Sequence, residues 1–192
     1  YFGSPGADAV ADLTLTGTAA GDDFGASVGA AGDVNGDGYA DVIVGAYFYA
    51  SGQPMEGHAC LYNGSASGLS ASADWSAVGN KDNALFGASV GAAGDVNGDG
   101  YADVIVGTPL YNNGQLDEGR AYVYHGSASG LSATANWTAE SDQASAEFGI
   151  SVGTAGDVNG DGYADVIVGT YYYDGGQVDE GRAYVYHGSA SG

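Results

Sequence analysis

The stretch "AGDVNGDGYADVIVG" at residues 31–45 recurs letter for letter at 93–107 and at 155–169. The flanking segments keep the same step of 62 residues. "FGASVG" at 24–29 and 86–91, and "FGISVG" at 148–153, precede the three copies, and "GHACLYNGSASG" at 57–68 becomes "GRAYVYHGSASG" at 119–130 and 181–192. A fixed period of this length indicates a repeat architecture in which each unit packs on the next.

The composition favours strands over helices. Of the 192 residues 44% are hydrophobic, and the chain holds 36 Gly and 15 Tyr. Each Gly inside a helix costs about 1 kcal/mol relative to Ala, whereas short Val, Ile and Tyr runs between Gly-rich turns are typical of strands. The strands expected in each unit are small residues as at 27–31, an apolar run as at 42–44, an aromatic run as at 121–124, and a fourth around Trp75 or Trp137. The fold class is therefore all-β, a β-propeller of four-stranded blades.

The phase of the repeat predicts how the blades are divided along the chain. Residues 13–16 correspond to a fourth strand, and "YFGSPG" at 1–6 matches the end of a third strand and its turn. The chain closes on "YVYHGSASG", at the same place in the cycle, and lacks a starting Met, so we expect an excised or mature piece. One domain, 1–192, thus has units of approximately 1–61, 62–123 and 124–186, with 187–192 overlapping the next unit.

Three blades per chain are too few for a closed ring, which usually has about 4–8. Two chains that exchange their terminal strands would form a homodimer of six blades. The alternative is an open fragment whose unpaired edges invite association.

The repeated loop has the spacing of a calcium site. Oxygen-bearing side chains occupy its positions 1, 3, 5 and 9, Gly at position 6 permits a sharp turn, and the backbone carbonyl at position 7 supplies another oxygen. The first six positions match the EF-hand loop, but position 12 is Val44 and a strand follows. Metal-free Asx-turns are the alternative, and they do not explain four oxygen residues at the same positions in every copy. The candidate ligands are Asp33, Asn35, Asp37, Tyr39 and Asp41; Asp95, Asn97, Asp99, Tyr101 and Asp103; and Asp157, Asn159, Asp161, Tyr163 and Asp165.

The charge supports a cation as partner. The formal net charge is -21, with 24 acidic residues and three Lys or Arg, and nine of the acidic residues lie in the three loops. Such a surface repels nucleic acid and anionic membranes, and no apolar run reaches the ~20 residues that span a bilayer. Mg²⁺ requires stricter octahedral geometry, so we expect three Ca²⁺ per chain.

These motifs together resemble the FG-GAP repeats of integrin α subunits and bacterial surface proteins. The resemblance rests on "FGASVG", "GDVNGDGYADVIVG", "GTP" at 107–109 and "GRAYVYHG", although "GAY" at 45–47 and "GTY" at 169–171 replace "GAP". It implies four-stranded blades with Ca²⁺ in the hairpin loop between the first two strands. It also implies a propeller of usually seven blades, more than this chain supplies.

The resulting interpretation is a non-enzymatic, calcium-binding module for adhesion, protein interaction or self-assembly, located outside cells or on their surface. The competing hypothesis is a fragment of a larger seven-bladed propeller attached to a hydrolase or lyase. No unique acid, base or nucleophile supports it, because His125 and His187 are repeat equivalents. The aromatic runs at 47–49 and 171–173 suggest a loop face for a protein or glycan ligand, and Cys60 is expected in the core.

Overall fold

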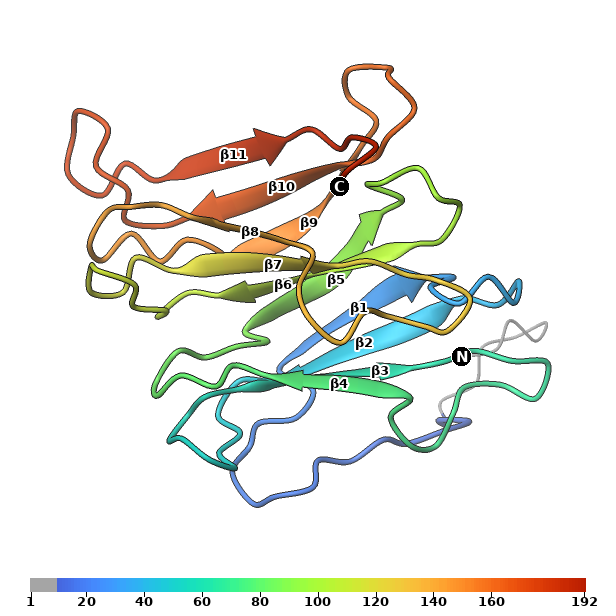
Figure 1. The fold of residues 1–192 in the computed structure, drawn as a ribbon. Coiled ribbons are helices and arrows are strands. Elements are labelled where there is room, and N and C mark those ends of the chain that lie inside the picture. Colours follow the sequence, from blue (N-terminus) through green and yellow to red (C-terminus); the bar gives the residue numbers. More distant parts are fainter. Residues whose placement is uncertain (1–9) are drawn as a thin grey trace.

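A computed structural model describes residues 10–192, so the "YFGSPG" segment lies outside the described residues. The described chain contains eleven strands and no helix, arranged as three antiparallel sheets stacked face to face (Figure 1). Blade 1 comprises β1 (Ser27–Gly32), β2 (Asp41–Ala46), β3 (His58–Tyr62) and β4 (Trp75–Val78). Blade 2 comprises β5 (Ser89–Gly94), β6 (Asp103–Thr108), β7 (Arg120–Tyr124) and β8 (Trp137–Glu140). Blade 3 comprises β9 (Ser151–Gly156), β10 (Asp165–Thr170) and β11 (Arg182–Tyr186).

Each blade is a simple meander. The strands pair in chain order, β1-β2-β3-β4 and β5-β6-β7-β8, and the third sheet has the order β11-β10-β9. The first strand of each blade is built from small residues because it lies innermost, where β1 contacts β5 and β5 contacts β9. The second strand reads Val-Ile-Val because neighbouring blades cover both of its faces; all of β6 is buried. These observations confirm the all-β, three-blade prediction.

The core lies between the blades. Ile43 and Leu61 of blade 1 pack against Val104, Val106 and Tyr124 of blade 2. The same arrangement recurs one step along, where Ile105 and Val123 of blade 2 pack against Val166 and Val168 of blade 3. Side chains therefore alternate between two interfaces along each strand, as the two-residue period of a strand requires.

The two tryptophans are packing residues of the outer strands. The Trp75 ring meets Tyr124 edge to face, with 4.9 Å between ring centroids, and its Nε1 donates a hydrogen bond to the Ser132 carbonyl at 3.0 Å. Trp137 meets Tyr186 in the same way, also at 4.9 Å. Each indole thus joins the edge of one blade to the face of the next.

The prediction of a strand at residues 13–16 is wrong for the single chain. This segment forms no ladder, and Figure 1 shows it running along the face of blade 1 that points away from blade 3. A strand needs a hydrogen-bonded neighbour, and residues 10–192 supply no third strand that this segment could extend at this end of the stack.

Candidate metal centre

The three acidic loops each connect the first and second strands of a blade, so all three project from the same end of the sheets (Figure 1). The tight Gly-rich connection forms because its side chains replace the missing ladder partners of the backbone. In the first loop, Asp33 Oδ1 accepts hydrogen bonds from the amides of Gly36 and Asp37, at 2.7 and 3.1 Å. Its Oδ2 accepts one from the amide of Gly38 at 2.8 Å.

Positions 3 and 5 complete the curl of the loop. Asn35 Oδ1 accepts a hydrogen bond from the Asp37 amide at 3.0 Å, and Asn35 Nδ2 donates one to Asp37 Oδ2, also at 3.0 Å. Asp37 Oδ1 accepts a hydrogen bond from the Tyr39 amide at 2.9 Å. The loop therefore brings Asp33, Asn35 and Asp37 together around one turn.

The other two loops repeat this pattern with nearly the same distances. The hydrogen bond from the position-4 amide to the position-1 carboxylate is 2.7 Å long in all three copies. The hydrogen bond from the position-6 amide to the same carboxylate is 2.8, 2.8 and 2.9 Å long. Identical sequence thus produces identical local geometry in three different surroundings. The loop conformation is encoded by the loop itself.

The ninth residue is placed differently from the others. The Asp41 carboxylate is fully buried at the start of β2, and its two oxygens accept hydrogen bonds from the amides of Val34 and Gly64, both at 2.8 Å. Asp103 and Asp165 are equally buried and make the equivalent bonds. This residue therefore fastens the loop to the turn after the third strand. A carboxylate offers about four lone-pair sites, so two remain after these bonds.

Burial and hydrogen bonding oppose each other in setting the pKa of these carboxyl groups. Desolvation raises the pKa of Asp41 and of Asp103 above the ordinary value, although their backbone hydrogen bonds act to lower it. At Asp165 burial also acts to raise the pKa, but the amides of Val158 and Gly188, with His187, outweigh it and the pKa is lowered. His187 Nδ1 lies 3.2 Å from Asp165 Oδ1.

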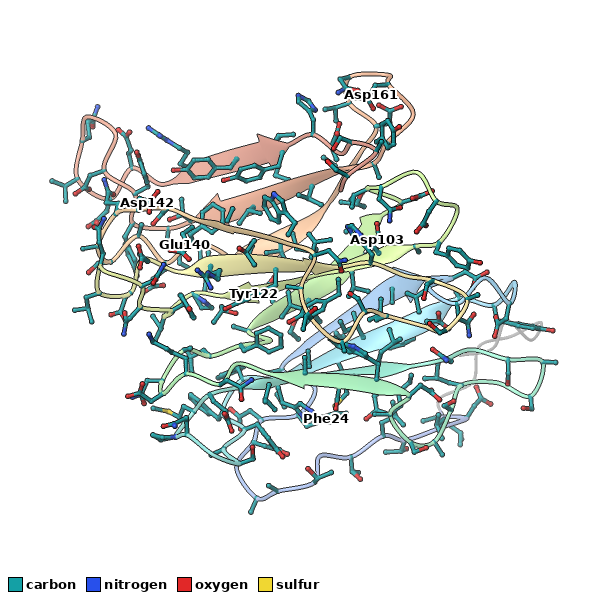
Figure 2. The ribbon with its side chains drawn as sticks, viewed as in Figure 1. Phe24, Asp103, Tyr122, Glu140, Asp142 and Asp161 are labelled. Atoms are coloured by element: carbon teal, nitrogen blue, oxygen red, sulfur yellow. The ribbon has the colours of Figure 1, made fainter. Side chains whose placement is uncertain are left out.

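The loop carboxylates at positions 1 and 5 have no ion-pair partner within the described part of the chain. The three Lys and Arg side chains, Lys81, Arg120 and Arg182, occupy segments at the opposite end of the sheets. Figure 2 shows the separation, with Asp161 in a loop at one end and Glu140 and Asp142 at the other. Uncompensated carboxylates and amide oxygens on one tight turn form a donor set suited to a hard cation.

The first two loops also contact the next blade. The carbonyl oxygens of Asp33 and Val34 accept hydrogen bonds from Ala102 and Ser127, both at 3.0 Å. The Tyr101 ring lies against Gly36, where an added Cβ would meet Tyr101 Cε1 at 2.6 Å. The second loop contacts blade 3 through the equivalent bonds Ala164 to Asp95 and Ser189 to Val96. A change in one loop therefore bears directly on the neighbouring loop.

The closest group of three carboxylates in the described residues lies elsewhere. One ligand oxygen each from Glu118, Glu140 and Asp142 lie within 4.8 Å of one another, whereas no loop contains such a set. Glu118 Oε2 is buried without a hydrogen-bond partner, but the Arg120 guanidinium forms an ion pair with Glu140. A protein cation is therefore already part of this cluster.

Repeat-based reasoning missed two features. Glu140 and Asp142 have Val78 and Asn80 at the corresponding places in the first copy, so no repeated pattern marks them. The inward orientation of Asp41 was also missed. Its signal is the apolar strand that follows immediately, since the first residue of a buried strand is itself drawn into the core.

Comparison with known proteins agrees with this architecture. The FG-GAP repeat family matches residues 24–57, 86–124 and 148–186, more than half of the chain. Human integrin alpha-7 is 31% identical over 169 residues, and integrin alpha-PS2 of Drosophila melanogaster is 32% identical over 175 residues. Each alignment covers 84% of this chain but only 13% and 12% of the respective relative. Integrin alpha-5 of Xenopus laevis is 28% identical over 192 residues, covering 88% of this chain and 16% of its own length. The chain thus spans about an eighth of the curated relatives it matches, and it belongs to the FG-GAP repeat family.

Proposed function

We propose that this chain is a non-enzymatic propeller module that binds one Ca²⁺ in each acidic loop and serves adhesion or protein interaction outside cells. The observation that carries the proposal is the threefold recurrence of one oxygen-rich turn whose position-1 and position-5 carboxylates lack a protein cation. In each loop the ligands would be the side chains of positions 1, 3, 5 and 9 and the carbonyl of position 7. Bound Ca²⁺ would offset two of the three negative charges of carboxylates that otherwise repel one another.

The stabilising effect follows from mass action. An ion that binds only the folded loop adds about 2.7 kcal/mol per site when its concentration is 100 times the dissociation constant. The millimolar calcium outside cells suits such sites. The described residues contain no helix that is long and apolar enough to cross a membrane.

Exposed aromatic side chains favour an interaction role. Tyr171 and Tyr172 follow β10 with exposed fractions of 60% and 45%, and Phe48 at the corresponding place in blade 1 is 38% exposed. These side chains lie in the loops between second and third strands, at the end opposite the acidic loops. Tyrosines supply large contact area at low entropic cost, which suits a protein or glycan ligand.

The proposal is tested by titrating metal-free protein with Ca²⁺ in a calorimeter and by recording melting curves with and without a chelator. We expect three ions per chain and a marked fall in melting temperature after chelation. Mg²⁺ and Na⁺ at matched ionic strength separate specific binding from general screening of the charge of -21. Binding heats that are absent, together with an unchanged melting curve, would refute the proposal.

One matched pair of variants locates the sites. Asp99→Asn keeps an oxygen acceptor for the Tyr101 amide but removes a carboxylate from the second loop, and should lower the stoichiometry from three to two. Asp82→Asn makes the same charge change at an exposed position between β4 and β5, and should leave three ions bound.

A further inference from the structure

Blade 3 is incomplete in a specific way. Its sheet ends at β11, whereas the other two sheets continue to a fourth strand. By the 62-residue repeat, the missing strand corresponds to residues 13–16, the counterparts of β4 and β8. Within residues 10–192, this segment lies at the other end of the stack and pairs with no strand.

The segment nevertheless already occupies the place of a preceding blade's outer strand. Leu15 packs on the cluster of Val44, Cys60 and Tyr62 on the free face of blade 1. Its repeat equivalents Ala77 and Ala139 pack on the corresponding clusters between blades. Within residues 10–192, blade 1 therefore carries the counterpart of an outer strand without the three inner strands of that blade, and blade 3 has three inner strands without an outer one.

The free face of blade 3 exposes apolar side chains that are buried in the other blades. Val158, Ile167 and Val185 are 57%, 38% and 47% exposed. Their equivalents in blade 1 are Val34, Ile43 and Leu61, which are at most 1% exposed, and those in blade 2 are at most 5% exposed. Side chains of the next blade provide that cover for blades 1 and 2.

The free face of blade 1 is the complementary surface. Val28 is 65% exposed although its equivalent Val90 is 7% exposed, and Tyr39 is 43% exposed. A cavity of about 520 Å³ opens beside Tyr39, lined also by Ala40, Gly64 and Ser65. Their equivalents in blade 2 lie around Val34 of blade 1. Ala102 packs in the same cluster as Val34, Gly126 lies next to the Val34 carbonyl oxygen, and the Ser127 amide donates a hydrogen bond to that oxygen. By the repeat, this cavity is where Val158 of a second copy would lie.

We propose that a second copy of this chain docks on these two faces, with residues 13–16 of each copy adding a fourth strand to blade 3 of the other. The pairing register is set by β3 with β4, where Leu61 faces Trp75 and His58 faces Val78. By the repeat, Val185 faces Leu13 and Arg182 faces Thr16 of the second copy. The two contacts are the same, so the pair closes into a ring of six blades.

The blade count is compatible with two copies. Two copies supply six blades, which lies within the usual range of about 4–8 for a closed ring. A head-to-tail contact that did not close would instead produce a filament. Docking also covers the open edge of β11, which is otherwise a site for aggregation.

The same repeat equivalence predicts further hydrogen bonds between the two copies. The amides of Ala40 and Ser65 would donate to the carbonyls of Asp157 and Val158 of the second copy, as Ala102 and Ser127 do to Asp33 and Val34. The Val28 amide would donate to Ser151 Oγ of the second copy, as Val90 does to Ser27 at 3.0 Å and Val152 does to Ser89 at 2.9 Å. These groups therefore gain the partners that the inner interfaces already provide.

Gly169 supplies a variant that separates folding from docking. A Cβ on Gly169 meets only Ser151 of its own chain, at an ordinary 3.5 Å. At the equivalent Gly107 a Cβ would overlap the backbone of Gly149 in the next blade. Gly169→Ala should therefore leave the single chain folded but place its Cβ against Gly25 of the second copy.

The first experiment is native mass spectrometry of the chain in saturating Ca²⁺, with calcium content read from the same spectra. We expect a species of twice the 19.0 kDa chain mass. Gly169→Ala should shift the protein to the monomer with calcium content per chain retained, whereas Gly52→Ala, whose Cβ meets nothing within 4 Å, should remain dimeric. A monomeric parent chain, or a ladder of larger species, would overturn the proposal. Because calcium is counted separately, failure of docking is distinguishable from failure of metal binding.

A disulfide trap tests the register without weakening any contact. In a Cys60→Ala background, Leu13→Cys with Val185→Cys should produce a covalent dimer on a non-reducing gel, since facing residues of paired strands have Cβ atoms about 4.5–5.5 Å apart. Leu13→Cys with Val178→Cys is the control, because Val178 lies in the loop before β11 and is 82% exposed. Equal cross-linking of the two pairs would refute the register.

Discussion

The closest approach between blades occurs at Gly107, and Gly107→Ala measures how much stability depends on it. The added Cβ would overlap the Gly149 carbonyl oxygen and lie 2.9 Å from its carbon, where real contacts essentially never fall below 3.0 Å. Both partners are backbone, so no rotamer change relieves the overlap, and blades 2 and 3 must separate by about 1 Å. A gap of that size forfeits about half of the dispersion attraction across the contact. We expect a loss of about 3 kcal/mol, at the upper end of the range for overpacking.

Thermal unfolding provides the assay. For a chain of this length, 1 kcal/mol corresponds to about 2–4 °C, so the melting temperature of Gly107→Ala should fall by about 6–12 °C. Gly45→Ala, which meets Gly87 in the same way at the first interface, should behave alike. Gly52→Ala makes the same substitution at an exposed loop and should stay within about 2 °C of the parent. Equal melting temperatures for Gly107→Ala and Gly52→Ala would refute the proposed close packing of blades.

Three further predictions concern individual side chains. Glu56 is 1% exposed, and its Oε1 accepts three hydrogen bonds of 2.8 Å from Ser51 and Gly52. Burial acts to raise the pKa of Glu56, but these hydrogen bonds lower that pKa below its ordinary value of 4.5. Because the folded pKa is depressed, the stabilisation is present above pH 4.5 and is lost as pH falls through the folded value. Glu56→Gln should therefore cost about 2 kcal/mol of stability at pH 7. The difference in melting temperature between the variant and the parent chain should shrink below pH 4.5, and a difference that stayed constant would contradict this explanation. Trp75→Phe should cost about 1 kcal/mol through the lost bond to Ser132, and Trp75→Ala about 3 kcal/mol, as measured by denaturant unfolding. Burial raises the pKa of the Cys60 thiol to about 11, so labelling by a thiol reagent at pH 8 should be slow until the chain unfolds, and rapid labelling of native protein would argue against a buried thiol.

Much of the fold could be predicted because the same pattern of residues occurs in three copies of one unit. The period located the strands around Val42, Tyr122 and Trp75, and the structure confirms them. The prediction failed at residues 13–16 because a strand forms only beside a second strand, whereas the sequence pattern describes one strand alone. The same limit applies to Ile167, which reads as a buried residue but is 38% exposed in the single chain.

The candidate site was predictable to a different degree. The turn around Asp33 forms from its own hydrogen bonds, so its local sequence was sufficient. The role of Asp41 depends on Gly64, 23 residues away, and no spacing rule within the loop reveals that bond. The cluster of Glu118, Glu140 and Asp142 combines residues from two segments far apart in the chain and, among the described residues, occurs in one blade only.

The backbone hydrogen bonds between neighbouring loops make the three loops unequal in their support. The first and second loops are each braced by a following loop, through Ala102 on Asp33 and Ala164 on Asp95, but the third loop around Asp157 has no such brace from residues 10–192. The third loop has the same internal hydrogen bonds but fewer contacts that hold it in place, so a single chain should have two stronger sites and one weaker one. Docking of a second copy would brace the third loop and equalise the three. By thermodynamic reciprocity, the factor by which docking tightens the third site equals the factor by which the ion in that site tightens docking. Calcium concentration would then control assembly chiefly through a single loop of the three.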